Sequence, residues 1–199
     1  MSQCKIHPPP PKKIFRFDDV CINSDIELHN QMTDWLFEKF PHCEVIWAVS
    51  PLVSSGAEPG RVFPRVWSAY SSWDIHCHYD TFGIPNIHPK VTRATHGLIH
   101  ADHRFLPYEA QRMSIHLSAR LIGASLFVPP FNKWNEDTER ACGATRLIKF
   151  ENGWRSMEHN LHTDKNWTCG EPGRSFPGQQ WYLHAREWTM DKFKKWFEV

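Results

Sequence analysis

Hydrophobic and polar positions alternate or recur at helical spacing along the N-terminal part of the chain. Residues 14–20, IFRFDDV, alternate and are rich in Phe and Ile, which predicts a strand that ends at two acidic residues. Residues 24–40 place apolar side chains at helical spacing, with Ser24 or Asp25 as the N-cap. The apolar run EVIWAVSPLV at 44–53 is typical of a buried strand.

In the rest of the chain, segments with helical spacing again alternate with segments typical of strands. Residues 107–123 predict a helix closed by Gly123, and 124–131 predict a short strand stopped by Pro129 and Pro130. Further predicted elements are a helix at 135–144, strands at 145–150 and 180–185, and an amphipathic helix at 189–199.

Strands and helices that alternate in this order predict an α/β fold with a mostly parallel sheet or barrel. Residues 54–95 are mixed and punctuated by Gly and Pro, so we expect them to be irregular. Residues 1–13 contain four consecutive prolines and predict a stiff tail, which leaves a single domain at 14–199. Functional side chains of such folds gather at the carboxyl ends of strands.

Composition and charge exclude several classes of partner. The 199 residues are enough for one ordinary domain with a sizeable core. A net charge of +1 gives no reason to expect nucleic acid or an acidic membrane surface as a partner. No run is long enough for a transmembrane segment, and the N-terminus lacks the apolar core of a signal peptide. We therefore predict a cytoplasmic protein whose six scattered cysteines are free thiols.

Asp18 and Asp19 stand side by side at the end of the first predicted strand. Adjacent strand residues face opposite sides, but where the chain turns at a strand end both carboxylates can reach one pocket. Two adjacent carboxylates repel each other, and a bound cation relieves that cost while leaving one Asp free as a base. The alternative is a pair that caps a helix or stabilises a turn.

Three of the thirteen histidines lie within THGLIHADH. His96 and His100 are four apart, a spacing that brings two imidazoles onto one metal ion from one side of a helical turn. Gly97 makes a loop an equal expectation, and two unrelated surface histidines are the alternative. His76 and His78 alternate along DIHCHYD and form a rival metal-binding pair.

Two later motifs combine rigidity with aromatic residues. Pro129 and Pro130 in LFVPPF predict a rigid loop after a strand. His184 stands in WYLHAREW beside Trp181 and Tyr182, which predicts either a histidine in an aromatic wall or a packed core histidine. With ten tryptophans in the chain, a ring-stacking pocket for sugars competes with an aromatic-rich core.

The order of four motifs along the chain resembles the polysaccharide deacetylase family. These motifs are Asp-Asp, His-x-x-x-His, Pro-Pro-aromatic and Leu-His. The family is carbohydrate esterase family 4, which includes chitooligosaccharide deacetylases, and the resemblance covers residues 14–190. It implies a distorted (β/α) barrel with one divalent metal held by an Asp and two His. Zinc is the first expectation for such ligands, and iron, cobalt or manganese also fit.

The resemblance also implies a role for each motif residue. Asp18 corresponds to the catalytic base, and Asp19, His96 and His100 correspond to the metal ligands. His184 corresponds to the general acid that protonates the departing amine. The implied reaction is metal-dependent hydrolysis, in which metal-activated water removes an acetyl group from an amino sugar or glycan precursor.

Substrate contacts are implied at Pro130 and Phe131, and Trp134 and Trp181 are further candidates to stack on a sugar ring. With a cytoplasmic location, the expected partner is an N-acetylated sugar, either a soluble or a lipid-linked intermediate of surface-glycan synthesis. Neither nucleic acid nor a membrane is an expected partner.

The chain departs from the family pattern at three places. The family usually has Thr-Phe-Asp-Asp-Gly, whereas Arg16 and Val20 flank the motif here. The family has an Arg directly before the proline pair, where this chain has Val128; Arg16, Arg104 and Arg186 are candidates to replace it. The family's Asp-Trp motif has no clear match in 153–167. The residues that could replace that motif are Glu158, His159 and Asn160.

These departures keep other functions open. A divergent subfamily could act on another substrate, including a non-sugar amide. A non-catalytic carbohydrate-binding relative could keep the fold, and a purely structural α/β domain would need the five motif residues to coincide by chance. Asp102 and His103 are candidates to orient the metal ligands, or they belong to a solvated loop.

Overall fold

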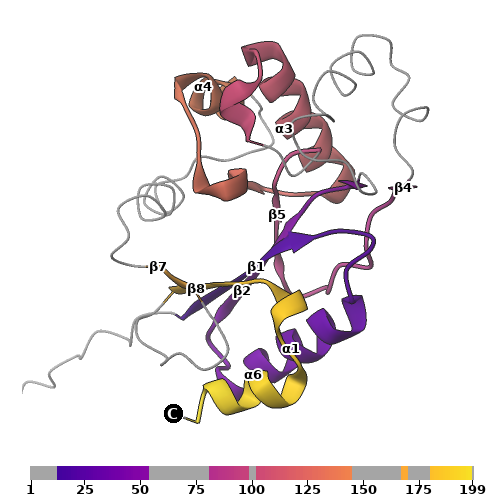
Figure 1. Cartoon of the computed structure of the whole chain (residues 1–199), viewed down its shortest axis with the longest axis vertical. Helices are drawn as coiled ribbons and strands as arrows, with labels where there is room; N and C mark the ends of the chain where they lie inside the picture. Colours follow the sequence, from indigo (N-terminus) through magenta and orange to yellow (C-terminus); the bar gives the residue numbers. More distant parts are fainter. Residues whose placement is uncertain (1–12, 54–80, 99–101, 145–166, 170–179, 199) are drawn as a thin grey trace, which may run out of the picture.

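The computed structural model describes residues 13–53, 81–98, 102–144, 167–169 and 180–198. Its centre is a six-stranded sheet in the order β6-β5-β2-β1-β8-β7, in which all neighbouring strands are parallel (Figure 1). The strands are β1 (Ile14–Val20), β2 (Glu44–Val49), β5 (Thr92–Thr95), β6 (Leu126–Phe127), β7 (Trp167–Cys169) and β8 (Gln180–Leu183). The α/β class and the parallel sheet predicted from the sequence are confirmed.

Helices connect or follow these strands. The α-helices described are α1 (Ile26–Lys39), α3 (Tyr108–Ile122), α4 (Glu136–Ala144) and α6 (Met190–Trp196). The described residues also form three short 3-10 helices, η2 (His103–Phe105), η3 (Pro130–Asn132) and η4 (Ala185–Glu187). β3 (Leu52–Val53) pairs antiparallel with β4 (Thr81–Phe82). Among the described helices, none has the length and apolar character that a bilayer crossing requires.

Two helix ends follow directly from the local sequence. The Asp25 carboxylate accepts a hydrogen bond from the Leu28 backbone N–H at 2.9 Å and so caps α1. Gly123 ends α3 in the left-handed conformation with φ 64°, which glycine adopts without steric strain. Both ends confirm predictions made from the sequence.

The sheet also contains strands that the sequence pattern did not predict. β5 lies within the stretch 54–95, which was expected to be irregular, yet it pairs with both β2 and β6. β7 was not predicted either, and the single strand expected at 44–53 divides into β2 and β3. The tail at 1–12 and the strand expected at 145–150 lie outside the described residues.

Helices α1, α3 and α6 cover the same face of the sheet. The Trp47 indole N–H on β2 donates to the Thr33 hydroxyl of α1 at 3.1 Å, and Val49 lies on the same face two residues later. Val49 pairs with Thr95, whose hydroxyl donates to the Ser118 hydroxyl of α3 at 2.7 Å. The pairing therefore places α1 and α3 on one side.

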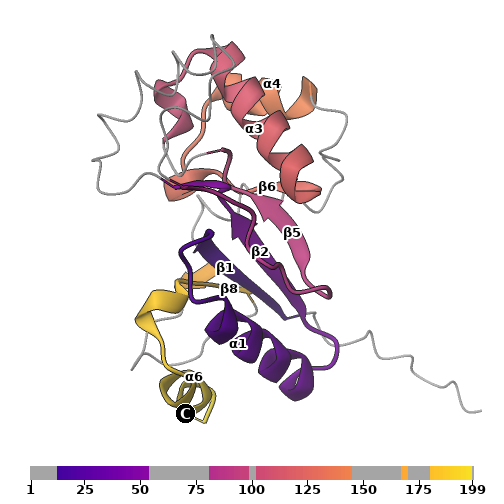
Figure 2. The ribbon, with the colours of Figure 1, turned by 90° about the vertical axis from the view of Figure 1, so that its right-hand side faces the viewer.

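Aromatic side chains attach α6 to that side. The rings of Phe17 on β1 and Phe193 on α6 are 6.5 Å apart, and Phe17 pairs with Trp47 in the sheet. Figure 2 shows α1 and α6 together beside β1 and β8, while α3 and α4 lie near β5 and β6. The motif residues lie on the opposite face of the sheet.

Candidate active site

The motif residues lie at the carboxyl ends of β1, β5 and β8, on the face opposite α1 and α6. Arg16 and Asp18 lie on that face of β1, as their mutual contact shows. His96 follows β5 and His184 follows β8, two residues after Tyr182, which pairs with Arg16. Three of the sequence-predicted site positions therefore share one edge of the sheet, as the rule for parallel strands requires.

An irregularity in β1 allows two consecutive carboxylates to reach one site. The register shifts between Phe17 and Val20, so that Asp18 and Asp19 together oppose Ala48 alone. Asp19 takes the left-handed conformation with φ 59°, an uncommon one for a residue other than glycine. Both carboxylates consequently line one pocket of about 260 Å³. We expected the chain to turn where the strand ends, whereas Asp18 and Asp19 lie within β1, between residues that pair with β2.

Arg16 forms a two-point ion pair with Asp18. Its Nε donates to Asp18 Oδ1 and its Nη2 to Asp18 Oδ2, both at 2.6 Å. The Arg16 side chain is fully buried, and its guanidinium lies 5.6 Å from the centre of the Tyr182 ring. Both carboxylate oxygens of Asp18 are thereby fixed in orientation.

Of the three arginines considered from the sequence, Arg16 is the one that contacts Asp18. Arg104 instead pairs with Asp102 at 2.7 Å on the surface, and its hydrogen bonds lower the pKa of the Asp102 carboxyl. Arg186 extends toward Asp19, with Nη2 3.9 Å from Oδ2. The guanidinium beside Asp18 therefore comes from the same strand.

His96 is buried and its ring orientation is fixed by the backbone. Its Nδ1 lies 2.8 Å from the Val128 carbonyl oxygen, which only accepts, so this nitrogen carries the proton. Its Nε2 accepts a hydrogen bond from the Asp19 backbone N–H at 3.3 Å and lies 3.8 Å from Asp18 Oδ1. The Nδ1 contact fixes the ring as in metal-binding histidines, while the Nε2 lone pair accepts the Asp19 backbone N–H, which a metal ion bound to Nε2 would displace.

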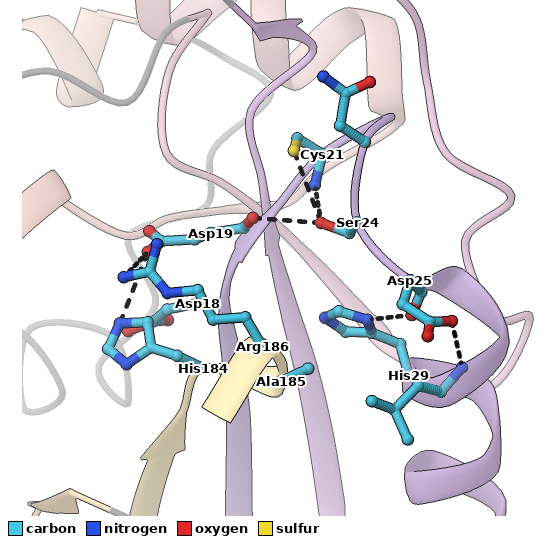
Figure 3. Close-up of a pocket in the computed structure, with 11 residues that line it drawn as sticks. Asp18, Asp19, Cys21, Ser24, Asp25, His29, His184, Ala185 and Arg186 are labelled. Atoms are coloured by element: carbon cyan, nitrogen blue, oxygen red, sulfur yellow. Dashed lines mark hydrogen bonds and ion pairs between the residues drawn. The ribbon is translucent and has the colours of Figure 1, made fainter. Parts of the chain in front are cut away.

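His184 lies on the other side of the acidic pair. Its Nε2 is 3.6 Å from Asp19 Oδ2, its Nδ1 is 3.9 Å from Glu187 Oε1, and the side chain is 25% exposed. Figure 3 shows His184 and Arg186 next to Asp18 and Asp19. Partial exposure matters here because a group that exchanges protons with a ligand must be accessible to it.

The residues described fit part of a metal site. The carboxylate that contacts His96 Nε2 is that of Asp18, at 3.8 Å, while the Asp19 carboxylate contacts His184 at 3.6 Å. His100, the third ligand implied by the resemblance, lies outside the described residues, as do His76, His78 and Glu158. Within the part of the chain that the structure describes, no group of three or more His, Cys, Asp or Glu side chains could hold a metal ion. The oriented ring of His96 beside the Asp18 carboxylate is the feature that suits a divalent cation.

The loop that carries His96 rests on a buried polar contact. His103 is fully buried, with Nε2 3.1 Å from the Ser114 hydroxyl of α3, and that hydroxyl also accepts from the Leu98 backbone N–H at 3.0 Å. His103 therefore belongs to neither a solvated loop nor the open pocket. It supports the turn that follows His96.

Gly97 is required by this packing, and Gly97→Ala tests it. Gly97 has φ 92°, and an added Cβ would lie 2.5 Å from His103 Nε2 and 2.8 Å from Ser114 Oγ. Strain and overpacking together predict a loss of about 2–4 kcal/mol in the free energy of unfolding, measured by urea denaturation.

Gly143→Ala is the matched control, since Gly143 lies in α4 and an added Cβ would meet nothing within 4 Å. A helical Gly→Ala change at such a position is expected to leave stability equal or raise it by about 0.4–1 kcal/mol. Equal stabilities for the two variants would contradict the packing described around Gly97.

The aromatic residues expected to contact substrate separate into two groups. Trp181 is fully buried on the helix-covered face, with its ring 4.8 Å from Phe15 and 6.4 Å from Trp196. It is a core residue and the prediction that it stacks on a sugar is wrong, because β8 points its side chain away from the site. Trp188, near His184 in sequence, is also buried.

Pro130, Phe131 and Trp134 follow β6 and remain candidates. Phe131 is 50% exposed and has φ 58°, which is rare for a bulky residue and typical of functional loops. The Trp134 indole N–H donates to Glu139 Oε1 at 3.1 Å, and Pro130 is buried at the start of η3. Their contact with substrate stays a prediction.

Sequence reasoning missed one histidine at this site. His29, on α1, is 4% exposed and lines the same pocket as Asp18 and His184. It stands three and seven residues before the buried Met32 and Leu36, so helical spacing could have placed it on the inner face of α1.

No protein-family model matches this chain, and no curated protein or solved structure matches it either. The order of the motifs and the geometry of the site are therefore what support a function.

Proposed function

We propose that this protein is a metal-dependent hydrolase of the polysaccharide deacetylase type that removes an N-acetyl group from an amino sugar or glycan precursor. The observation that carries this proposal is the acidic pair held between two imidazoles at the carboxyl ends of β1, β5 and β8. Asp18 lies 3.8 Å from His96 Nε2, and Asp19 lies 3.6 Å from His184 Nε2.

The strand arrangement supports a barrel of the deacetylase type. On one side of β1 lies β8, followed by β7, and on its other side β2, β5 and β6 follow in chain order. Helices α1, α3 and α6 on a single face support a singly wound (β/α) barrel, since a doubly wound sheet has helices on both faces.

Asp19 and His96 would hold the metal together with His100. Bound there, a zinc or similar divalent ion would lower the pKa of water and polarise the acyl oxygen. Asp18, fixed by Arg16, accepts the proton as water attacks the amide carbon. His184 then donates a proton to the nitrogen as the C–N bond breaks, which gives acetate and the free amine.

Metal analysis of three proteins tests this proposal. The wild-type chain should hold about one zinc per chain after loading, since Asp19 and His96 with a third ligand suit a catalytic zinc site. The variant His96→Gln with His100→Gln should lose it. His42→Gln is the control, because His42 is exposed and lies before β2, at the opposite end of that strand from the site.

Acetate release from N-acetyl-D-glucosamine and di-N-acetylchitobiose is then measured for the loaded proteins. Release by the wild type and the control, with none by the double variant, supports the deacetylase. Metal retained by the double variant contradicts this ligand set and points to His76 and His78. Sugar binding without acetate release would indicate a non-catalytic relative, and release only from simple amides would indicate a non-sugar amidase.

The physiological substrate follows from the predicted location. In the cytoplasm, an N-acetylated precursor of a surface glycan, soluble or lipid-linked, is the substrate we propose.

A further inference from the structure

His184 stands between two carboxylates, of which the proposed mechanism uses one. Its Nε2 lies 3.6 Å from Asp19 Oδ2 beside the pocket, as Figure 3 shows. The other ring nitrogen, Nδ1, lies 3.9 Å from Glu187 Oε1. A histidine that donates a proton needs one nitrogen directed at the substrate, so a group that holds the other nitrogen determines where the proton is delivered.

The short helix η4 keeps Glu187 beside His184. The Glu187 backbone N–H donates to the His184 carbonyl oxygen at 3.0 Å, which closes one 3-10 turn. In such a turn the side chains of residues three apart lie on the same side, one above the other. Trp188 anchors the end of the turn in the core, where its ring is 5.6 Å from that of Phe193. Backbone and core contacts therefore set the placement of the carboxylate relative to the imidazole.

Glu187 lies behind His184, away from the pocket. His184 lines the pocket and is 25% exposed, whereas Glu187 is 40% exposed and does not line it. The ring of Tyr182 bounds His184 on another side, edge-on with the ring centres 6.1 Å apart. A separation of 3.9 Å is longer than a hydrogen bond, and contacts between catalytic groups often shorten when substrate binds.

We propose that the Glu187 carboxylate accepts the Nδ1 proton of His184 and so directs Nε2 toward the amide nitrogen of the substrate; the role of His184 as proton donor rests on the proposed function. The proton delivered to the departing amine comes from Nε2, and the Nδ1 proton stays on the ring. Glu187 is a positioning residue, since it acts through His184 and does not touch the reacting amide.

A set of variants separates positioning from a structural role. Glu187→Ala removes the acceptor, and Glu187→Gln replaces the carboxylate by a neutral acceptor of the same length. Glu109→Gln is the matched control, since Glu109 also pairs with a residue three positions away, Arg112, at 2.9 Å on the exposed surface of α3. His184→Gln, alone and combined with Glu187→Ala, completes a double-mutant cycle.

We expect Glu187→Ala to lower kcat for acetate release from N-acetyl-D-glucosamine by about 10–100-fold, the usual effect of removing a group that orients a functional histidine. KM should stay within about twofold, because Glu187 does not line the pocket. Glu187→Gln should recover kcat to within about fivefold of wild type, since its amide oxygen accepts, and Glu109→Gln should equal wild type.

The double-mutant cycle is the part of the experiment that a structural role would not reproduce. In the His184→Gln background, Glu187→Ala should lower kcat by less than about twofold, because the group that it positions is already absent. Melting temperatures of all variants should agree with wild type within about 2 °C, since both side chains are partly exposed.

Nitrogen NMR measures the contact without catalysis. The Nδ1 resonance of His184 should move in Glu187→Ala and keep its position in Glu109→Gln, because only the first variant removes the acceptor beside Nδ1.

An unchanged kcat in Glu187→Ala would overturn the inference, as would an equal loss of kcat with and without His184. A Glu187→Gln variant as slow as Glu187→Ala would also overturn it, because a neutral acceptor would then fail to orient the ring. If the wild type releases no acetate, the hydrolase is refuted, and the Nδ1 resonance alone decides whether Glu187 holds His184. If acetate is released and the cycle shows no coupling, the hydrolase stands and this positioning is refuted.

Discussion

Arg16→Met is expected to lower the free energy of unfolding by about 3–5 kcal/mol, the usual consequence of removing one partner of a buried ion pair. Both oxygens of Asp18 bind Arg16 at 2.6 Å, and the two side chains are 0% and 8% exposed. Without the guanidinium, a carboxylate would remain buried with one of its charge partners removed. Urea denaturation followed by tryptophan fluorescence measures the change.

The double variant Arg16→Met with Asp18→Leu separates a buried charge from lost packing. Removing both charges should restore most of the lost stability, since an apolar pair can replace a buried ion pair at little cost. A double variant as unstable as Arg16→Met alone would show that Arg16 stabilises the fold through packing. The double variant should also release no acetate, because it lacks the proposed base.

His184→Gln should lower kcat for acetate release by about 10²–10⁴-fold, the range for loss of a general acid. Glutamine keeps polarity and similar length but cannot deliver a proton to the departing amine. Because His184 is 25% exposed and its contacts with Asp19 and Glu187 are long, at 3.6 and 3.9 Å, stability should change by no more than about 0.5 kcal/mol. Initial rates with N-acetyl-D-glucosamine and a thermal melt give the two quantities.

Arg186→Gln is the comparison for that measurement. Arg186 is 75% exposed, and its guanidinium lies 3.9 Å from Asp19 Oδ2, so it shares the neighbourhood of His184 without the proposed role. A decrease in kcat of similar size in both variants would contradict a specific proton donation by His184. A decrease confined to His184→Gln supports it.

The sequence predicted elements well where local chemistry is strong. The helix behind Asp25 and the end of α3 at Gly123 follow from capping, which involves residues close together in the chain. The same reasoning missed β5, because Thr92–Thr95 is short, polar and rich in threonine. That segment forms a strand because β2 and β6 pair with it on both sides.

The candidate site also contains residues that the sequence pattern identified and one, Trp181, that it assigned wrongly. Asp18, Asp19, His96 and His184 were found because their order and spacing are visible along the chain. Trp181 was assigned to the site because it stands close to His184, yet strand alternation and the packing of α6 place it in the core.

By itself, the sequence determined the α/β class, most helices and the identity of the candidate reactive groups, since these depend on periodicity and on residue type. Only the tertiary structure decided that Arg16 pairs with Asp18, that the Val128 carbonyl orients His96, and that both carboxylates line one pocket. The Val128–His96 contact joins residues far apart in the chain, while the Arg16 pair and the shared pocket depend on which face of β1 each side chain takes. Pairing of β1 with β2 and β8, together with an irregularity in β1, creates that arrangement, and no local pattern encodes it.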